Sequence, residues 1–451
     1  MNHLLIHLIL LVAGCFSSPL NLLHHGKRDS DINDLLQSKT AYKNLPPLKS
    51  HPSAEERTLK AGEIPNYVTQ YAPLVFLYSE EKYLPYNIEK YVSNFRPTWR
   101  NGTTIDILGK NPKDPFYQNQ KLNLSDLEHL PNSKEELVFL TSLSDFDTDP
   151  EFITGKNNKP NLYTGEISDA PVVLIVTDKG NGWIDAYWFY FYSFNLGPFV
   201  MGFGPFGDHV GDWEHSLVRF YNGEPVVVWM SAHGGGGAYF YEQLEKESLD
   251  GTGIGIGNGK QPVIFSSRGT HANYPSTGQH SHDIPYAILS DFTDRGSLWN
   301  PAMNYLAYTF TLNDESDEFE ISYGNGSHPL REQRFGKWLK FNGAWGDPTL
   351  DPDDPRQHWS PFEWKYIDGP TGPLTKNLLR TSPCQRAKWW NFWNGCNIRR
   401  YIQYGEGIFD KEGNNSCGHF YSRFQNKYIR RIVETLTMGG WICFLADLFY
   451  G

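Results

Sequence analysis

The sequence predicts a mostly β protein whose core domain is a β-sandwich. Phe, Trp and Tyr make up 15% of the 451 residues, and aromatic side chains favour strands. Short apolar runs are separated by clusters of Gly, Pro and Asn, which is the pattern of strands joined by turns. No long helical periodicity lies between these runs, so strands do not alternate with helices as they do in parallel folds. These observations favour two packed sheets with short helices and long irregular loops.

The N-terminal segment is typical of a secretory signal. Residues 4–16 are apolar apart from His7, a length that is too short to span a bilayer but suits the centre of a signal peptide. We therefore predict a signal peptide over residues 1–17, with an uncleaved membrane anchor as the alternative. Residues 18–63 are polar and contain Pro, which predicts a pro-segment or linker.

The predicted sandwich occupies residues 64–342. Its strand candidates are seven apolar runs, at 74–78, 172–176, 187–192, 217–221, 226–230, 263–265 and 305–312. Asn222 and Gly223 separate two of these runs, and Asn-Gly is a preferred pair for a tight hairpin turn. Residues 343–383 are dense in Pro, Gly and Asp, which predicts an irregular cover over the core.

The C-terminal extension, residues 384–451, carries four cysteines and one helical pattern. An even number of cysteines in an oxidising compartment predicts two disulfides, whose pairing the sequence leaves open. A zinc site is the alternative, although no C-x-x-C pair occurs. A repeat every four residues predicts one amphipathic helix. The cysteines are Cys384, Cys396, Cys417 and Cys443, and the repeat is Phe424, Tyr428, Ile432 and Leu436.

Four N-x-[ST] sequons follow the predicted signal peptide. They lie at Asn101, Asn123, Asn325 and Asn414, each among turn-forming residues, as accessible acceptors of N-glycans must. Together with the leader and the cysteines, they predict a glycoprotein of the secretory pathway, either in the vacuole lumen or secreted. Outside the leader, no apolar stretch is long enough to predict a transmembrane helix.

Charge and motif content exclude several classes of function. The net charge is −11 and no run of Lys or Arg exceeds two residues, whereas a protein that binds nucleic acid needs a basic face. The glycine-rich run at 251–257 lacks the spacing of a dinucleotide-binding loop. The sequence also contains no phosphate-binding loop, no nucleophile elbow and no H-E-x-x-H motif.

The densest polar cluster spans residues 207–215. If a strand includes Asp212 and Glu214, the two carboxylates point to the same side, and His209 can reach them from the preceding turn. Two carboxylates and one imidazole suit a hard divalent cation, so we predict a Ca²⁺ or Mg²⁺ site. A buried, hydrogen-bonded network without metal is the alternative.

Three further histidines accompany this cluster. His215 ends it, His233 precedes four glycines, and His271 follows Gly269-Thr270. We predict that these histidines line a cleft or support the metal ligands. For each of them, a purely structural and hydrogen-bonded role is the alternative.

Several motifs that occur in order resemble the fungal vacuolar protein sorting-associated protein 62 family. They are APLVFLY at 72–78, GDWEH at 211–215, SAH at 231–233 and GTHANYP at 269–275. The resemblance covers roughly residues 64–320. It implies a role in delivering proteins to the vacuole, with no assigned chemistry.

A second, fainter resemblance concerns the central motif. The run HVGDWE at 209–214, followed by SAHGG at 231–235, is similar to the signature of the necrosis- and ethylene-inducing-peptide-like cytolysins. This resemblance implies a β-sandwich with a divalent cation, and it places His233 behind the ligands. Gly211 replaces a His of the motif. The implied ligands are His209, Asp212, Glu214 and, in place of an earlier Asp, Asn195. The cytolysins bind plant membrane glycolipids.

We therefore expect a non-enzymatic glycoprotein of vacuolar trafficking that recognises a glycan or a lipid head group beside its cation site. A metal-assisted vacuolar hydrolase and a secreted cytolysin are the alternatives. Asp212 and Glu214 would lie about 7 Å apart along one strand face. That arrangement suits a shared ion better than a pair of carboxylates on opposite sides of a scissile bond.

Overall fold

The computed structural model describes most of the chain between residues 45 and 385, and a few positions beyond. The described residues are 45–107, 121–132, 136–199, 204–233, 235–249, 254–256, 259–281, 290–312, 319–324, 336–359, 363–385, 396, 398–399, 402, 428 and 432. The chain forms two compact units, Met1–Leu45 and Pro46–Gly451. All features below belong to the second unit.

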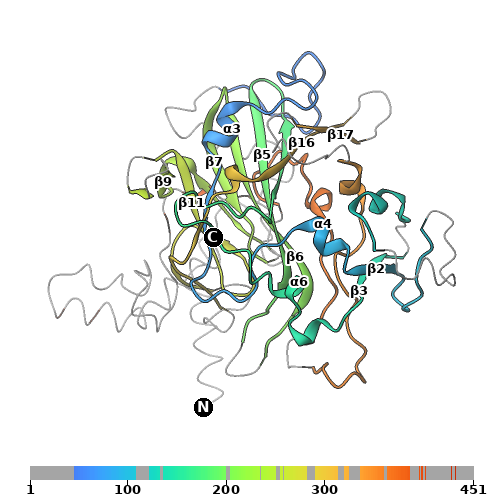
Figure 1. Cartoon of the computed structure of the whole chain (residues 1–451). Coiled ribbons are helices and arrows are strands. Elements are labelled where there is room, and N and C mark those ends of the chain that lie inside the picture. Colours follow the sequence, from blue (N-terminus) through green and yellow to red (C-terminus); the bar gives the residue numbers. More distant parts are fainter. Residues whose placement is uncertain are drawn as a thin grey trace, which may run out of the picture. The chain divides into compact units, whose positions relative to one another are not determined.

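The main sheet has eight strands in the order β17-β16-β4-β5-β6-β7-β8-β18. Figure 1 labels five of them, β17, β16, β5, β6 and β7. The pairs β16–β4 and β18–β8 are parallel, and the other neighbours are antiparallel. The strands span Val172–Asp178 (β4), Trp183–Asn195 (β5), His209–Tyr221 (β6), Glu224–Met230 (β7), Gly237–Phe240 (β8), Tyr305–Leu312 (β16), Phe319–Tyr323 (β17) and Ile398–Arg399 (β18). The long strands β5 and β6 carry most of the polar residues considered below.

The second sheet has the order β10-β9-β11-β1-β15, with β12 paired to β11. Its strands span Leu74–Phe76 (β1), Lys246–Leu249 (β9), Ile254–Ile256 (β10), Gln261–Ser266 (β11), Asn273–Tyr274 (β12) and Leu298–Trp299 (β15). Two small hairpin-like pairs lie outside both sheets. They are Phe95–Thr98 (β2) with Phe139–Ser142 (β3), and Gly278–Ser281 (β13) with Ser290–Thr293 (β14).

The helices of the described chain are short. The α-helices are Asn66–Gln70 (α3), Ile88–Val92 (α4) and Glu151–Thr154 (α6). The 3-10 helices are Leu124–His129 (η2), Phe146–Thr148 (η3), Tyr241–Gln243 (η4), Pro301–Met303 (η5), Gly336–Lys340 (η6) and Pro373–Lys376 (η7). Helix α4 begins at a capped residue, because the side chain of Asn87 accepts hydrogen bonds from the first-turn N–H groups of Glu89 and Lys90.

The two sheets pack through side chains that alternate along β5. Trp188, Tyr190 and Tyr192 point from β5 into the core, which they share with Ile264 of β11 and Trp299 of β15. The rings of Tyr190 and Trp299 lie 5.5 Å apart, measured between centroids. Every residue of β5 is buried, because both faces of the strand are covered. This explains why β5 lacks the apolar–polar alternation of a half-exposed strand.

The segment 336–385 covers the outer face of the main sheet, the face that points away from the second sheet. The ring of Trp345 lies 5.9 Å from that of Phe191 on β5 and 5.2 Å from that of Trp213 on β6. Trp338 packs at 5.7 Å from Trp345. The described part of the segment consists of turns, isolated bridges and two short 3-10 helices.

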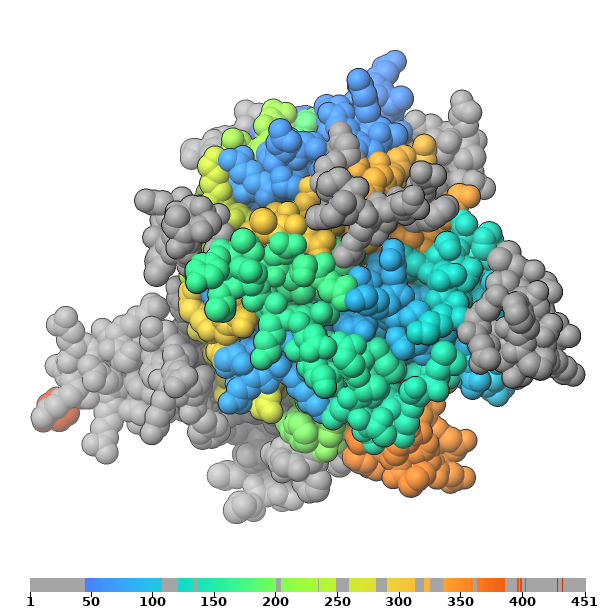
Figure 2. Space-filling view, in the orientation of Figure 1, coloured from blue at the N-terminus to red at the C-terminus, as the bar shows by residue number. Residues whose placement is uncertain are grey.

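The start of the described chain also lies on the main sheet. The backbone N–H of Thr58 donates to Asp178 over 2.6 Å, and that of Gly62 donates to the Thr309 hydroxyl over 2.7 Å. In Figure 2 this N-terminal part, in blue, lies beside the orange segment that contains β16. Residues 46–63, which we predicted to be part of a pro-segment or linker, therefore make hydrogen bonds with the sheet. Whether they are removed stays a prediction, as do the other domain boundaries.

The structure confirms the mostly β class and the disulfide in the C-terminal extension. Asn222 and Gly223 have φ angles of 48° and 83° and form the predicted hairpin turn between β6 and β7. Cys384 and Cys396 form a disulfide with a Cα–Cα distance of 5.5 Å. Tyr428 and Ile432 of the predicted C-terminal helix are helical. Outside the described residues lie the leader and Cys417, Cys443, Asn325 and Asn414. No helix of the described part combines the length and the apolar character that crossing a bilayer requires.

Gly211 occupies the position at which the cytolysin signature has a His. The fold explains why this chain has glycine there. Its φ is +74°, and a Cβ atom at this position would lie 1.9 Å from the carbonyl oxygen of Trp345. The cover therefore approaches β6 too closely for any side chain. We expect Gly211→Ala to lower the free energy of unfolding by at least about 2 kcal/mol, because it combines left-handed strain with a backbone clash. Urea denaturation measures this loss.

A matched control separates the two causes. Gly102 has a φ of +80°, and a Cβ atom added there would meet no other described atom within 4 Å, so Gly102→Ala introduces the strain without the clash. We expect it to cost about 1 kcal/mol. Equal losses in the two variants would contradict the close approach at Gly211.

Candidate functional site at the start of strand β6

The candidate site lies where β5 ends and β6 begins. Asn195, the last residue of β5, pairs with His209, the first residue of β6. Further along β6, Asp212 pairs with Tyr192 and Glu214 with Tyr190. Tyr190 and Tyr192 point into the core between the sheets, so Asp212 and Glu214 share this inner face, as the alternation of a strand requires.

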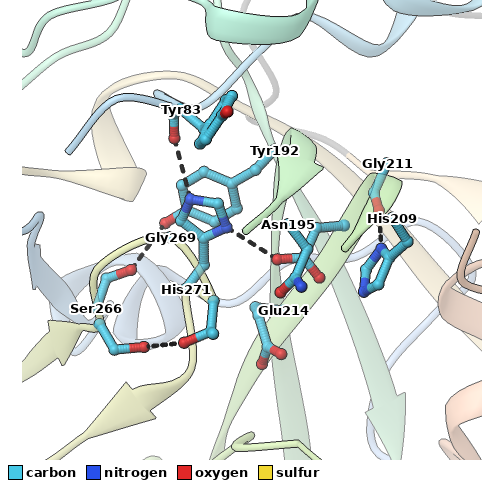
Figure 3. Close-up of polar contacts among 12 residues, drawn as sticks. Tyr83, Tyr192, Asn195, His209, Gly211, Glu214, Ser266, Gly269 and His271 are labelled. Atoms are coloured by element: carbon cyan, nitrogen blue, oxygen red, sulfur yellow. Dashed lines mark hydrogen bonds and ion pairs between the residues drawn. The ribbon is translucent and has the colours of Figure 1, made fainter. Parts of the chain in front are cut away.

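His271 binds Asp212. The Nδ1 atom of His271 lies 2.9 Å from Oδ2 of Asp212, and its Nε2 atom lies 3.0 Å from the carbonyl oxygen of Tyr83 and 3.7 Å from Glu81. All of these partners are acceptors, so both ring nitrogens carry protons. The ring also stacks on Tyr192, with centroids 3.7 Å apart (Figure 3).

The charge of His271 follows from its two carboxylate neighbours. Burial by itself would lower the pKa of His271, but Glu81 and Asp212 raise it to about 9. Burial would likewise raise the pKa of Glu81, but His271 and the backbone N–H of Gly269 hold it below its usual value. His271 is thus an imidazolium that fixes the orientation of Asp212, which is the structural role named above as the alternative for this residue.

Glu214 is bound by a hydroxyl group, whereas Asp212 is bound by the charged ring of His271. Its Oε2 atom accepts a hydrogen bond from the hydroxyl of Ser231. Burial and the neighbouring Asp212 together raise the pKa of Glu214 to about 8. At neutral pH this carboxyl group is therefore mostly protonated, because two carboxylates in a poorly hydrated site repel each other.

His209 and Asn195 each present an acceptor atom. Nδ1 of His209 lies 2.7 Å from the carbonyl oxygen of Gly211, so Nδ1 is the protonated nitrogen and Nε2 keeps its lone pair. Burial lowers the pKa of His209, which favours this neutral ring. The amide nitrogen of Asn195 donates to the carbonyl of Gly207 over 3.2 Å, which turns its oxygen away from that contact. Figure 3 shows Asn195, His209 and Glu214 in the region around His271.

These side chains have the chemistry that a divalent cation requires. A metal-bound His commonly donates its other ring N–H to a backbone carbonyl, as His209 does, and carboxylate and amide oxygens suit Ca²⁺ or Mg²⁺. The distances between these side chains, however, do not match those of a metal site. Among the described residues, no group of three or more His, Cys, Asp and Glu side chains lies in a metal-binding arrangement. Binding would require the side chains to draw together, so the cation site stays a prediction.

His233 borders this site and has a buried partner that the sequence did not reveal. Its Nε2 atom lies 2.6 Å from Oδ2 of Asp291. Asp291 is nearly inaccessible and also accepts hydrogen bonds of 2.7 Å from the hydroxyl groups of Thr270 and Tyr274. The charge of His233 acts on Glu214 and lowers its pKa. A lone Asp 58 residues away carries no motif, so sequence reasoning missed it.

His215 lies on the other face of the main sheet. Its ring stacks on Phe189 with centroids 4.7 Å apart and packs 4.8 Å from Trp229. Burial lowers its pKa well below the usual value. The same alternation that brings Asp212 and Glu214 together places His215 with Trp213 on the outer face, away from the candidate site.

Comparisons with known proteins point to one family. Residues 145–305 match the family described as vacuolar protein sorting-associated protein 62. The protein of that name from Saccharomyces cerevisiae is 47% identical over 93% of this chain and 90% of its own length. A second protein of the same yeast, named TDA6, is 46% identical over 90% of this chain and 88% of its own length.

Two solved structures show a weak similarity. One, described as a toxin fold for microbial attack and plant defense, shares 12% identity over 57% of this chain and 82% of that chain, with a TM-score of 0.24. The other, Necrosis and Ethylene inducing Protein 2 from the causal agent of cocoa's Witches Broom disease, shares 10% identity over 47% of this chain and 79% of that chain, with a TM-score of 0.18. Scores this low support no conclusion about this chain.

Proposed function

The chain belongs to the vacuolar protein sorting-associated protein 62 family, and from this we propose that it acts in the delivery of proteins to the vacuole. The observation that carries the proposal is the 47% identity to the yeast protein, which extends over 93% of this chain. We place its action in the lumen of the secretory pathway. In support, the described sequon residues Asn101 and Asn123 are both exposed, as acceptors of N-glycans must be.

A sorting assay tests this proposal. In cells from which the gene has been removed, we expect a soluble vacuolar hydrolase to be partly secreted into the medium instead of reaching the vacuole. Expression of the intact chain should restore its retention, and immunoblots of medium and cells measure the two fractions. Normal retention in the absence of the gene would contradict the proposal.

We further propose that the start of β6 recognises a glycan or a lipid head group through a divalent cation. The ligands would be His209, Asp212, Glu214 and Asn195. A bound cation would neutralise the carboxylates and offer open positions to hydroxyl or phosphate oxygens. Support comes from the lone pair on Nε2 of His209 and from the pKa of Glu214, which desolvation and the neighbouring Asp212 raise. The role of the chain itself is orientation, because His271 and Ser231 hold Asp212 and Glu214 in place.

Calorimetry with Ca²⁺ and with Mg²⁺ tests the cation site. We expect the wild-type protein to bind one of the two ions, and Glu214→Gln to weaken binding at least about tenfold, because glutamine cannot ionise on binding to supply a carboxylate ligand. Glutamine keeps the shape of the protonated carboxyl, so folding should be preserved. Glu55→Gln, at an exposed position, is the matched control. A wild-type protein that gives no binding heat with either ion would remove the cation from the proposal.

A metal-assisted hydrolase is the second candidate function. The observation that favours it is the pair of His233 and Asp291, because a carboxylate that orients a partly exposed imidazole is an arrangement used in general base catalysis. Glu214, with its raised pKa, could supply the acid. Purified protein should be assayed on phosphoester, ester and glycoside substrates. Turnover that Asp291→Asn reduces at least about a hundredfold would favour this candidate over recognition.

A further inference from the structure

A second polar cluster lies on the outer face of the main sheet, away from the candidate site. Asp185 of β5 pairs with Arg219 of β6, and the guanidinium binds the carboxylate through two hydrogen bonds of 2.7 Å. Lys179 lies beside them, with its Nζ atom 4.0 Å from Oδ2 of Asp185. The side chains of all three residues are fully buried.

Residues 373–385, which we call the strap, cover this cluster. The ammonium of Lys179 donates to the carbonyl of Leu378 over 2.8 Å, and Arg219 donates to that of Thr381 over 2.5 Å. The strap also contributes Arg380, whose guanidinium carbon lies 4.9 Å from the ring of Trp229. The strap is therefore bound to the sheet by hydrogen bonds in which side chains of the sheet donate to backbone carbonyl oxygens of the strap.

The charges of this cluster do not balance. Lys179, Arg219 and Arg380 are cationic groups, and Asp185 is the one carboxylate that Lys179 and Arg219 contact among the described residues. Arg380 donates instead to the carbonyl oxygens of Lys376 and Pro383. Arg380 is 5% exposed, so water does not compensate the excess. Carbonyl oxygens contribute only partial charges, and an uncompensated buried charge is costly. Burial lowers the pKa of Lys179 to about 7, so below that pH the cluster carries its full positive charge.

Several polar groups of the same cluster lack a hydrogen-bond partner. Nη2 of Arg380, Nε1 of Trp229 and both ring nitrogens of His215 are buried without one in the part of the chain that the structure describes. These groups are neighbours, because Trp229 contacts both the Arg380 guanidinium and the His215 ring. Guanidinium and indole nitrogens can only donate. Arg380 and Trp229 therefore lack an acceptor, whereas the neutral ring of His215 has one donor and one acceptor nitrogen. The excess of cations favours an acceptor with negative charge.

We propose that this cluster binds a small monovalent anion of the size of a halide, which accepts hydrogen bonds from Arg380 and Trp229 and offsets one of the two excess positive charges beneath the strap. The inference is independent of the function proposed above, because it concerns the opposite face of the sheet. The anion would fasten the strap, and with it the start of the C-terminal extension at Cys384.

Bromide is the probe, because its anomalous scattering identifies it in a crystal. In crystals of the full-length protein grown or soaked in bromide, we expect an anomalous peak within hydrogen-bond distance of Nη2 of Arg380. A water molecule at that place, without an anomalous signal, would overturn the proposal. This measurement uses the wild-type protein, so it does not depend on the folding of any variant.

Thermal unfolding at pH 5.5 provides the second measurement. At constant ionic strength, replacing gluconate by bromide should raise the unfolding midpoint by roughly 2 °C for each tenfold increase of bromide above its dissociation constant. Lys179→Met removes one of the two excess positive charges and should weaken this dependence. Arg96→Met, at an exposed position, should retain it. A midpoint that does not respond to bromide in the wild-type protein contradicts the proposal.

Discussion

Replacing Asp185 by Asn is expected to lower the free energy of unfolding by about 3–5 kcal/mol, which is the usual cost of removing one partner of a buried ion pair. Asp185 accepts two hydrogen bonds from Arg219 and lies beside Lys179. Without this carboxylate, three buried cationic groups would face one another beneath the strap. Urea denaturation followed by tryptophan fluorescence measures the loss, since Trp229 lies next to the cluster.

The stability of the protein also depends on pH through the protonation of Lys179 in this cluster. Burial lowers the pKa of Lys179 from 10.5 to about 7, so the folded protein binds this proton less tightly than the unfolded chain does. The Lys179 contribution therefore makes the protein more stable as the pH rises from about 7 towards 10.5, and it corresponds to roughly 5 kcal/mol over that window. Lys179→Met should lack this rise.

The double variant Asp185→Asn/Lys179→Met is the matched control. It removes one negative and one positive charge, so the imbalance returns to that of the wild-type protein. We expect it to regain at least about 1 kcal/mol relative to Asp185→Asn alone. If the second substitution instead adds its own loss to the first, electrostatic repulsion is not the cause of the instability.

Replacing His271 by Gln is expected to lower the free energy of unfolding by about 3 kcal/mol at acidic pH. The imidazolium lies between Glu81 and Asp212 and stacks on Tyr192. Its pKa is raised from 6.5 to about 9, a difference that corresponds to about 3 kcal/mol. Because the folded-state pKa is the higher one, this contribution is complete below pH 6.5 and is lost as the pH rises through 9.

The measurement compares denaturation of the wild-type protein and the variant at pH 5.5 and pH 9.5, in the presence of a chelator. The difference in unfolding free energy should be largest at pH 5.5 and should shrink by several-fold at pH 9.5. His51→Gln, at an exposed position, is the control and should leave the stability unchanged at both values. A loss that is equal at the two pH values would mean that His271 acts only through packing.

The fold class and the position of the polar cluster could be predicted because they rest on local patterns. The hairpin at Asn222-Gly223 is a property of two residues, and the shared side of Asp212 and Glu214 follows from the two-residue period of a strand. The same two-residue period places His215 on the opposite face of β6. The prediction that His215 lines a cleft with Asp212 was therefore inconsistent with the alternation of the strand.

The partners of the site could not be predicted, for a physical reason. Glu81 reaches His271 from a loop that lies much earlier in the chain, and Asp291 reaches His233 from β14. These contacts depend on how the short strands of the second sheet and of the β13–β14 pair pack, and a strand such as β1 has only three residues. Three residues carry no periodicity from which a register can be derived.

The last strand of the main sheet, β18, pairs in parallel with β8 through only two residues. An uncovered β8 would offer a row of unpaired backbone groups to any other chain, which is how soluble β proteins begin to self-associate. Strand β18 thus covers this edge of β8 at the two positions where the strands pair. We therefore expect this edge of β8 to be protected from self-association only after residues 398–399 have been synthesised and have paired with it.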